Sequence, residues 1–255
     1  MERSRELPLT VRLDLKCSGY DPYLDCTCVQ ERSFEMRENK RKPCRYHTTI
    51  NPLVEVGHAQ RIRKLDVYLD ILDDSIKIGP EEYFRGFLNE LEFFAFPLPI
   101  LESLGFHVDH MLGLDNDTHM KLPGNLFHWG SLPPTKLRHL VLHGCYGGPI
   151  QAICNLTSFE LSGGPDDLDP IELDQHTFLP FISNNPSLVS LRLSECSFPR
   201  RALLSRITPV KLPELKSLRL TRIYGLSGVS GLIEVPPLQD VVLTLDLWSE
   251  ARTRY

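Results

Sequence analysis

The chain has 255 residues, a formal net charge of -5, 42% hydrophobic residues and 24% charged residues. This length allows one or two domains, and the composition is that of an average soluble globular protein, which argues against disordered, collagen-like and disulfide-rich small proteins. The negative charge argues against broad nucleic-acid binding, because such binding needs a basic surface that displaces counterions from phosphates.

Apolar residues and cysteines indicate where the protein resides. Residues 1–16 alternate charged with apolar residues and lack the apolar core of a secretory signal. The longest apolar stretches, such as residues 93–98, are far shorter than the roughly 20 residues that cross a bilayer. The seven cysteines are scattered and odd in number, so reduced thiols are expected. We therefore expect a cytoplasmic or nuclear protein that does not contact a membrane.

The first predicted element is a strand at residues 9–15, where apolar residues alternate with polar ones. Farther along, one motif recurs seven times: an apolar residue, two variable residues, an apolar residue, one variable residue and an apolar residue. The seven copies begin at Ile62, Leu101, Leu137, Leu156, Leu188, Leu215 and Leu238. Leucine-rich repeats are about 20–29 residues long, so the later copies fit that spacing and the earlier ones carry insertions.

Side-chain geometry gives each position of this motif a role. Side chains alternate along a strand, so the fourth and sixth positions point to one face, while the first position anchors the incoming turn. Stacked copies place these residues in columns that form one continuous core, because a single copy is too small to be stable alone. The motif predicts an α/β fold: an irregular leucine-rich-repeat solenoid, or horseshoe, with a concave parallel sheet and convex helices and loops.

Three segments between the strands have helix signals. Residues 79–91 open with Gly-Pro and continue with apolar residues at helical spacing. A second helix is expected to begin near Asp174, which suits an N-cap, and to end before Asn185. A third, at residues 199–207, has Pro199 in its first turn. Residues 18–52 do not fit the motif and are predicted to be a polar insertion or loop. Residues 109–130 are a second candidate insertion in a single domain spanning residues 1–255.

Two copies of the motif extend to a cysteine at the ninth position, in LRHLVLHGC (137–145) and NPSLVSLRLSEC (185–196). This extension resembles the cysteine-containing leucine-rich repeats of F-box proteins. Together with PLTVRLDL (8–15) and RIRKLDVYL (61–69), it is similar to the fungal F-box proteins in particular. The resemblance implies the substrate-binding part of a ubiquitin-ligase receptor. The helical F-box of that family precedes the first of these segments and is expected to be absent from this chain. Contact with a ubiquitin-ligase scaffold is therefore expected only if an F-box is supplied elsewhere.

Signals for catalysis are negative. The sequence contains no phosphate-binding loop, nucleophile elbow or zinc-protease helix motif, so we predict no catalytic residue and no cofactor. Cys145 and Cys196 are expected to pack as small apolar side chains. Weak candidates for a zinc site are Cys26, Cys28, Cys44 and His47. Their spacing departs from that of known zinc motifs, so ordinary loop thiols are preferred over a zinc site or a redox-sensitive pair.

The strand positions outside the core remain for binding. The residues predicted to form a partner-binding concave face are Arg63, Asp66, Tyr68, His107, Arg138, His139, His143, Glu160, Arg192 and Arg219. Three of these residues, Arg138, Arg192 and Arg219, are basic, and in the central columns only Glu160 opposes them. This favours an acidic protein or peptide ligand, because Arg forms bidentate bonds with carboxylates. The alternatives are an ordinary solvated face, a scaffold unrelated to ubiquitin transfer and, least favoured, a zinc- or thiol-dependent hydrolase.

Overall fold

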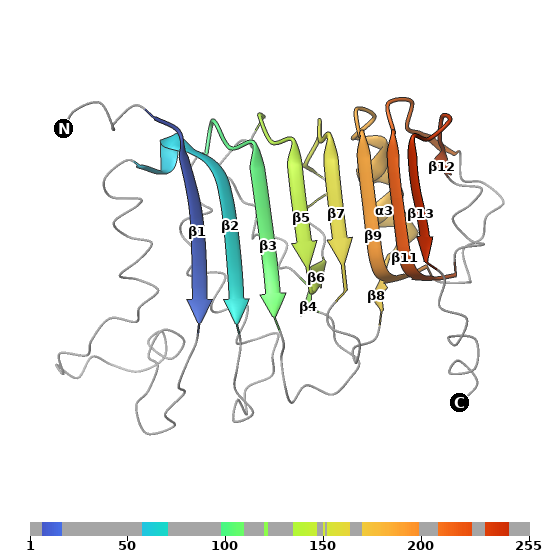
Figure 1. The fold of residues 1–255 in the computed structure, drawn as a ribbon, viewed down its shortest axis with the longest axis horizontal. Helices are drawn as coiled ribbons and strands as arrows, with labels where there is room; N and C mark the ends of the chain where they lie inside the picture. Colours follow the sequence, from blue (N-terminus) through green and yellow to red (C-terminus); the bar gives the residue numbers. More distant parts are fainter. Residues whose placement is uncertain are drawn as a thin grey trace, which may run out of the picture.

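The structure, a computed structural model, describes residues 7–16, 58–70, 98–109, 120–121, 135–146, 150, 152–163, 170–198, 209–225 and 233–244. Its main feature is a parallel sheet in which eight strands follow one another in chain order (Figure 1). These strands are β1 (Leu9–Lys16), β2 (Ile62–Asp70), β3 (Ser103–Asp109), β5 (His139–His143), β7 (Ser158–Ser162), β9 (Ser190–Ser197), β11 (Ser217–Tyr224) and β13 (Asp240–Thr244). The fold is therefore α/β with a parallel sheet and few helices among the described residues.

Shorter elements lie beside this sheet. The short strand β8 (Ile171–Glu172) pairs with β9, while β4 (Met120–Lys121) pairs with β6 (Cys145–Tyr146) and β10 (Val210–Lys211) with β12 (Ile233–Glu234). The helical elements are the 3-10 turn η2 (His58–Arg61) and the helix α3 (Gln175–Ser183). Among these described elements, no helix is long and apolar enough to cross a membrane.

Neighbouring strands of the sheet pair so that equal positions of the sequence motif lie side by side. Leu104 of β3 pairs with Leu65 of β2 and with Leu140 of β5, and all three occupy the fourth motif position. The same position continues through β7, β9, β11 and β13 as Phe159, Leu191, Leu218 and Val241. The predicted strands and their alignment are therefore confirmed for all seven copies.

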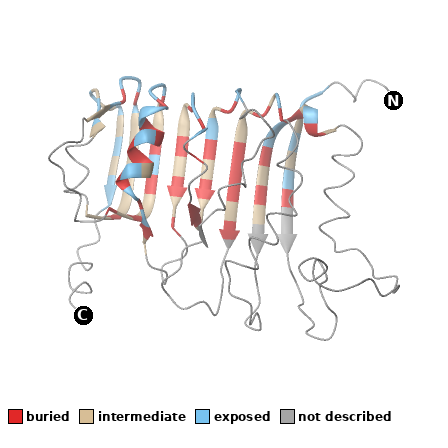
Figure 2. Ribbon diagram, turned by 180° about the vertical axis from the view of Figure 1, so that it is seen from behind, coloured by how far each residue is buried: buried red, intermediate tan, exposed pale blue. Residues whose placement is uncertain are grey.

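The core lies on one face of this sheet. The fourth-position side chains are at most 1% exposed from β2 to β9, and the first-position residues from Ile62 to Leu215 are buried as well. Figure 2 shows these buried positions as bands that cross the strands. Burial decreases toward the last strand, where Val241 and Leu243 are 50% and 54% exposed. Each fully buried large side chain contributes roughly 1.5–3 kcal/mol, so the central strands hold most of the stabilising contacts.

The eighth motif position changes the direction of the strand. Gly144, Glu195 and Arg222 all occupy this position and have φ values of 67°, 53° and 53°. A left-handed residue interrupts the alternation of side chains, so the ninth residue returns to the core face. The ninth-position residues Cys145 and Cys196 are accordingly 0% exposed. This confirms that both cysteines pack as small buried side chains.

Helix α3 begins and ends where the sequence predicts. The Asp174 side chain caps it, accepting hydrogen bonds from the His176 N–H at 3.1 Å and the Thr177 hydroxyl at 2.8 Å. Its buried residues face the sheet, where Phe181 meets Phe159 edge to face at 4.8 Å. The helix thereby covers the core face behind β9 and β11 (Figures 1 and 2).

A buried amide fastens the end of α3 to the preceding turn. Asn185 is 0% exposed, and its Nδ2 donates to the carbonyls of Ile153 and Phe181 at 3.0 and 2.7 Å. Its Oδ1 accepts from the Leu156 N–H at 2.8 Å. The sequence marked this residue only as a helix stop, whereas the structure shows that it joins α3 to the start of β7.

Other predicted elements fall outside the described part of the chain. These are the insertion at residues 18–52 and the helices expected at residues 79–91 and 199–207. The candidate insertion at residues 109–130 is described at three positions. Asp109 ends β3, and Met120–Lys121 form β4, which pairs with β6. Those positions therefore belong to strands and not to a loop.

Candidate functional site

The sheet face opposite α3 carries the candidate site, and we call it the open face. It is formed by the third, fifth and seventh motif positions of β2 to β13, together with the residues of β1 in register with them. Among the described residues, no helix or strand lies over this face in Figure 1. In the strands from β7 onward, the third and seventh positions are mostly serine or threonine, so charged and aromatic groups concentrate at few sites.

Planar side chains form a continuous row across β1, β2, β3 and β5. The Tyr68 and His107 rings stack with centroids 4.3 Å apart and an interplanar angle of 6°. The Arg12 guanidinium carbon lies 4.0 Å from the Tyr68 centroid. Because β1 and β3 flank β2 on opposite sides, Arg12 and His107 contact opposite faces of the Tyr68 ring. The row, which we call the planar row, ends at His143, whose ring centroid is 6.2 Å from that of His107.

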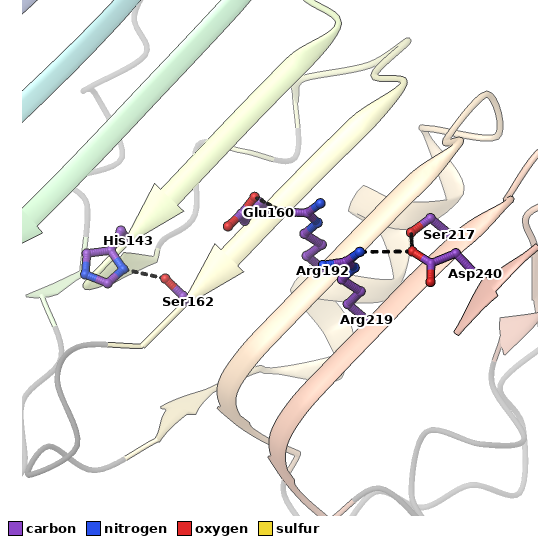
Figure 3. Close-up of polar contacts among 7 residues, drawn as sticks. All are labelled: His143, Glu160, Ser162, Arg192, Ser217, Arg219 and Asp240. Carbon is purple, nitrogen blue, oxygen red and sulfur yellow. Dashed lines mark hydrogen bonds and ion pairs between the residues drawn. The ribbon is translucent and has the colours of Figure 1, made fainter. Parts of the chain in front are cut away.

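A hydrogen bond orients the last ring of this row. The Nδ1 atom of His143 shares a hydrogen bond with the hydroxyl of Ser162, which occupies the same motif position on the neighbouring strand (Figure 3). This contact fixes the plane of the imidazole and carries the polar row one strand further. The seventh motif position therefore supplies one connected set of polar groups from β2 to β7.

A glycine makes room for two of these polar groups. A Cβ atom at Gly105 would lie 2.5 Å from the Asp66 Oδ1 atom and 2.9 Å from the His107 Nε2 atom. The carboxylate and the imidazole therefore both extend over the glycine backbone. The Lys64 ammonium pairs with the other Asp66 oxygen at 2.9 Å. Asp66, His107 and Lys64 are thus grouped around a position that only glycine leaves open.

The other half of the open face is occupied by ion pairs between neighbouring strands (Figure 3). Arg192 lies 3.5 Å from Glu160, and Arg219 lies 3.2 Å from Asp240. The hydrogen bonds that Arg219 and then Ser217 donate to Asp240 lower the pKa of its carboxyl group. These pairs are part-exposed and therefore add little to stability, but each gives its arginine a carboxylate partner on a neighbouring strand.

The prediction that only Glu160 opposes the arginines of the open face is therefore wrong. Arg192 and Arg219 each have a carboxylate partner on an adjacent strand, and Asp240, which the sequence reasoning missed, is one of them. Arg138 occupies the second motif position, and its Nη1 atom donates to the carbonyls of Leu137 and Asn155, both at 3.1 Å. It consequently binds backbone groups near the start of its strand.

The remaining predicted site residues divide between two places. Arg63 pairs with Glu102 at 2.7 Å, at the second motif position of neighbouring copies and away from the planar row. Asp66 and His139 lie on the open face, close to the planar row in register. Arg12 was missed, although the alternation of residues 9–15 places it on the open face. The missing signal was the register of β1 on β2, which shifts by one residue between Leu9 and Thr10.

The two buried thiols, Cys145 and Cys196, are poorly suited to nucleophilic chemistry. Burial raises the pKa of Cys145, and it raises that of Cys196 to about 12, so both remain neutral thiols near neutral pH. Cys154 is exposed. In the described part of the chain, no group of three or more His, Cys, Asp or Glu residues is placed to hold a metal ion. The zinc candidates Cys26, Cys28, Cys44 and His47 lie outside the described residues.

Two buried polar side chains near the start of α3 have no hydrogen-bond partner. They are Gln175, which is 4% exposed and unpaired at both amide atoms, and Tyr146, which is 8% exposed and unpaired at its hydroxyl. Burial, followed by the charges of Asp174 and Cys196, raises the pKa of Tyr146. Unpaired buried polar atoms are costly, so both positions lower the stability of the fold.

Comparison with known proteins gives no match: no family model, no curated protein and no solved structure is similar enough to this chain to be matched. The geometry of the open face is therefore the basis for a functional proposal.

Proposed function

We propose that this protein is a leucine-rich-repeat solenoid that recognises a protein or peptide, without catalysis, through the open face of its sheet. It resembles in this the substrate-binding part of an F-box ubiquitin-ligase receptor. The observation that carries the proposal is the open face itself: seven consecutive motif copies place polar side chains in register on one side and apolar columns on the other. Such repeat sheets provide extended binding surfaces.

The composition of the open face favours binding over catalysis. A catalytic site needs a nucleophile or an acid–base pair that is positioned against a substrate. His107 contacts an aromatic ring, His143 contacts a hydroxyl, and the two buried cysteines are held as neutral thiols. A row that combines Tyr, His and Arg is instead typical of the aromatic and arginine anchors at protein interfaces.

Two alternative functions are retained. A leucine-rich-repeat scaffold unrelated to ubiquitin transfer would use the same face and differ only in what happens to the partner. A zinc- or thiol-dependent hydrolase would need a metal site or a reactive cysteine outside the buried pair. Iodoacetamide labelling of the native protein, followed by peptide mass spectrometry, should modify Cys154 while Cys145 and Cys196 stay unmodified. Rapid labelling of either buried cysteine would contradict the structural role assigned to it.

The proposal is tested by blocking the face without changing the fold. Ser158 and Ser190 are register neighbours on the open face, and Ser158→Arg with Ser190→Arg would place two bulky side chains across it. The matched control is His176→Arg with Ser183→Arg, at exposed positions of α3 on the opposite side. Partners captured by the wild-type chain from a cell extract would be purified, and their affinities for each variant measured by calorimetry.

We expect the variant with Ser158→Arg and Ser190→Arg to lose at least about tenfold in affinity, because its two bulky side chains would cost more than about 1.4 kcal/mol of binding free energy. The α3 variant should bind as the wild type does. Equal binding by both variants would refute recognition through the open face. Cellular levels of the purified partner separate the two binding functions. Its accumulation on depletion of this protein supports the ubiquitin-ligase receptor, and unchanged levels with intact binding support the scaffold.

A further inference from the structure

We propose that β13 is an interface for a second copy of this chain: two β13 strands pair antiparallel about a two-fold axis and join two sheets into one. This inference goes beyond the proposed function and does not depend on it. Three observations carry it: the position of β13 at the end of the sheet, the exposure of its apolar side chains, and the self-complementary order of its residues.

Strand β13 ends the sheet in the described part of the chain (Figure 1). It pairs with β11 on one side, from Asp240 to Thr244, and no described strand pairs with its other side. Backbone N–H and C=O groups of a strand alternate between its two sides, so some of those in β13 point away from β11. Such an edge is a template for pairing with another strand.

Two apolar side chains of β13 are exposed on the core face. Val241 is 50% exposed and Leu243 is 54% exposed, whereas Leu191 and Leu193, at the same motif positions of β9, are 1% and 3% exposed. Of the four large apolar side chains that are exposed in the described part of the chain, these are the two that belong to a strand. Single exposed apolar residues are ordinary, but two neighbours beside an unpaired strand edge form a surface that another strand can cover.

The two ends of the sheet differ in charge. Strand β1, at the other end, alternates apolar residues with Arg12, Asp14 and Lys16. Charged residues of this kind keep edge strands from pairing with other chains. On β13 the one charged residue is Asp240, at its first position, and it pairs with Arg219 of β11 in the same chain. The other four residues, VVLT, include neither charge nor proline and favour strand pairing.

The order of residues in β13 suits pairing with its own copy. Opposite residues of an antiparallel pair have their side chains on the same face, and a two-fold axis perpendicular to the sheet preserves that face. With the axis at Val242, Val241 of each chain lies opposite Leu243 of the other, and Asp240 lies opposite Thr244. All five residues of each strand are then paired. The exposed apolar residues cover one another, and the two Asp240 carboxylates lie at opposite ends of the pair.

A second copy therefore matches this edge in its side chains as well as in its backbone. Any extended peptide can pair with the backbone of β13, but pockets and neighbours for alternate side chains give such pairing its specificity. Each strand has five residues, so the interface is small and we expect a weak dimer. Because the axis is perpendicular to the sheet, the open faces of both copies lie on the same side of the joined sheet.

The test introduces like or unlike charges at the two facing positions. One variant is Val241→Lys with Leu243→Lys, and the other is Val241→Asp with Leu243→Asp. Both positions are exposed, so the charges remain hydrated in the monomer. The matched control is Leu7→Lys with Thr10→Lys, at exposed positions beside the opposite end of the sheet. Sedimentation velocity would be measured from about 1 to about 200 µM, which spans weak association, and thermal melts would show that each variant is folded.

Wild type and control should sediment as monomers at the lowest concentration and increasingly as dimers as the concentration rises. Each charged variant should stay monomeric, because its introduced like charges would face each other. An equal mixture of the two charged variants should form dimers again, with a dissociation constant within about tenfold of that of the wild type, since unlike charges then lie opposite.

A wild type that stays monomeric throughout overturns the inference and leaves this edge to a strand of another protein. Dimers of either charged variant alone, or monomers alone in their mixture, overturn it as well. Loss of the dimer in the control would also do so, because the control leaves β13 unchanged. None of these outcomes affects the capture experiment with Ser158→Arg and Ser190→Arg, which tests recognition through the open face.

Discussion

Two buried amides show how differently the same group can act at the residue scale. Asn185 satisfies both its nitrogen and its oxygen through three hydrogen bonds that join α3 to the preceding turn. Gln175 is almost equally buried, at 4% exposed, but neither amide atom has a partner. The hydrogen bonds of Asn185 compensate for the loss of its hydration, whereas Gln175 has no such compensation.

Replacing each amide by an apolar side chain of similar shape should have opposite effects. Gln175→Met removes two unpaired polar atoms and is expected to raise the free energy of unfolding by about 1 kcal/mol. Asn185→Leu leaves two carbonyls and one N–H without partners and is expected to lower it by about 2–4 kcal/mol. Urea unfolding followed by circular dichroism measures both. A destabilised Gln175→Met variant would show that its amide is satisfied in solution.

At the scale of the elements, the fourth motif position is buried to different depths in different strands. Leu191 on β9 is 1% exposed and lies between Phe159 and Leu218 in the register of the sheet. Val241 occupies the same position on β13 and is 50% exposed, because β13 is the last strand in the described order of the sheet. The motif thus determines on which face of the sheet a residue lies, while the strands on both sides determine how deeply it is buried.

The same substitution at these two positions tests this distinction. Leu191→Asp places an unpaired carboxylate in the core and should cost at least about 3 kcal/mol or unfold the adjacent strands. Val241→Asp should cost less than about 1 kcal/mol, since its carboxylate remains hydrated. The free energies of unfolding of the two variants, measured in urea, test this difference in cost. Similar losses at both positions would mean that the register or the exposure of β13 differs from the one described.

At the scale of the whole molecule, the open face has two chemically different halves. Strands β1 to β5 carry the planar row, and strands β7 to β13 carry ion pairs that neutralise their own arginines. Charges that are already paired offer little to a partner, because binding would have to replace an existing contact.

The paired half should respond to acid. The pKa of Asp240 is lowered in the folded protein, so its contribution to stability is present above the ordinary carboxyl pKa of 3.8 and is lost as the pH falls through the lowered value. Asp240→Asn removes this contribution. The melting temperature of the variant should therefore fall less steeply than that of the wild type below about pH 4. The control is Glu214→Gln at an exposed position, and an identical pH profile for Asp240→Asn and wild type would contradict the expectation.

Much of the fold follows from short-range patterns in the sequence. The motif predicted the strands and their register, and a capping residue with a following Asn-Pro predicted the limits of α3, because alternation and capping depend on residues close together in the chain. The same patterns identified Tyr68, His107 and His143 as members of one face. They placed the arginines there too, but they could not show that Arg138 turns to the backbone or that Asp240 faces Arg219.

The sequence by itself determined which side of the sheet the third to seventh motif positions occupy, since that depends on the alternation of side chains along a strand. The tertiary structure alone decided which side chains touch across strands: the stacking of Tyr68 on His107, the pairing of Arg219 with Asp240, and the space over Gly105 that Asp66 and His107 share. These contacts join residues that are 21 to 41 positions apart. They depend on strand order and on side-chain rotamers, and neither is encoded in the local alternation of polar and apolar residues.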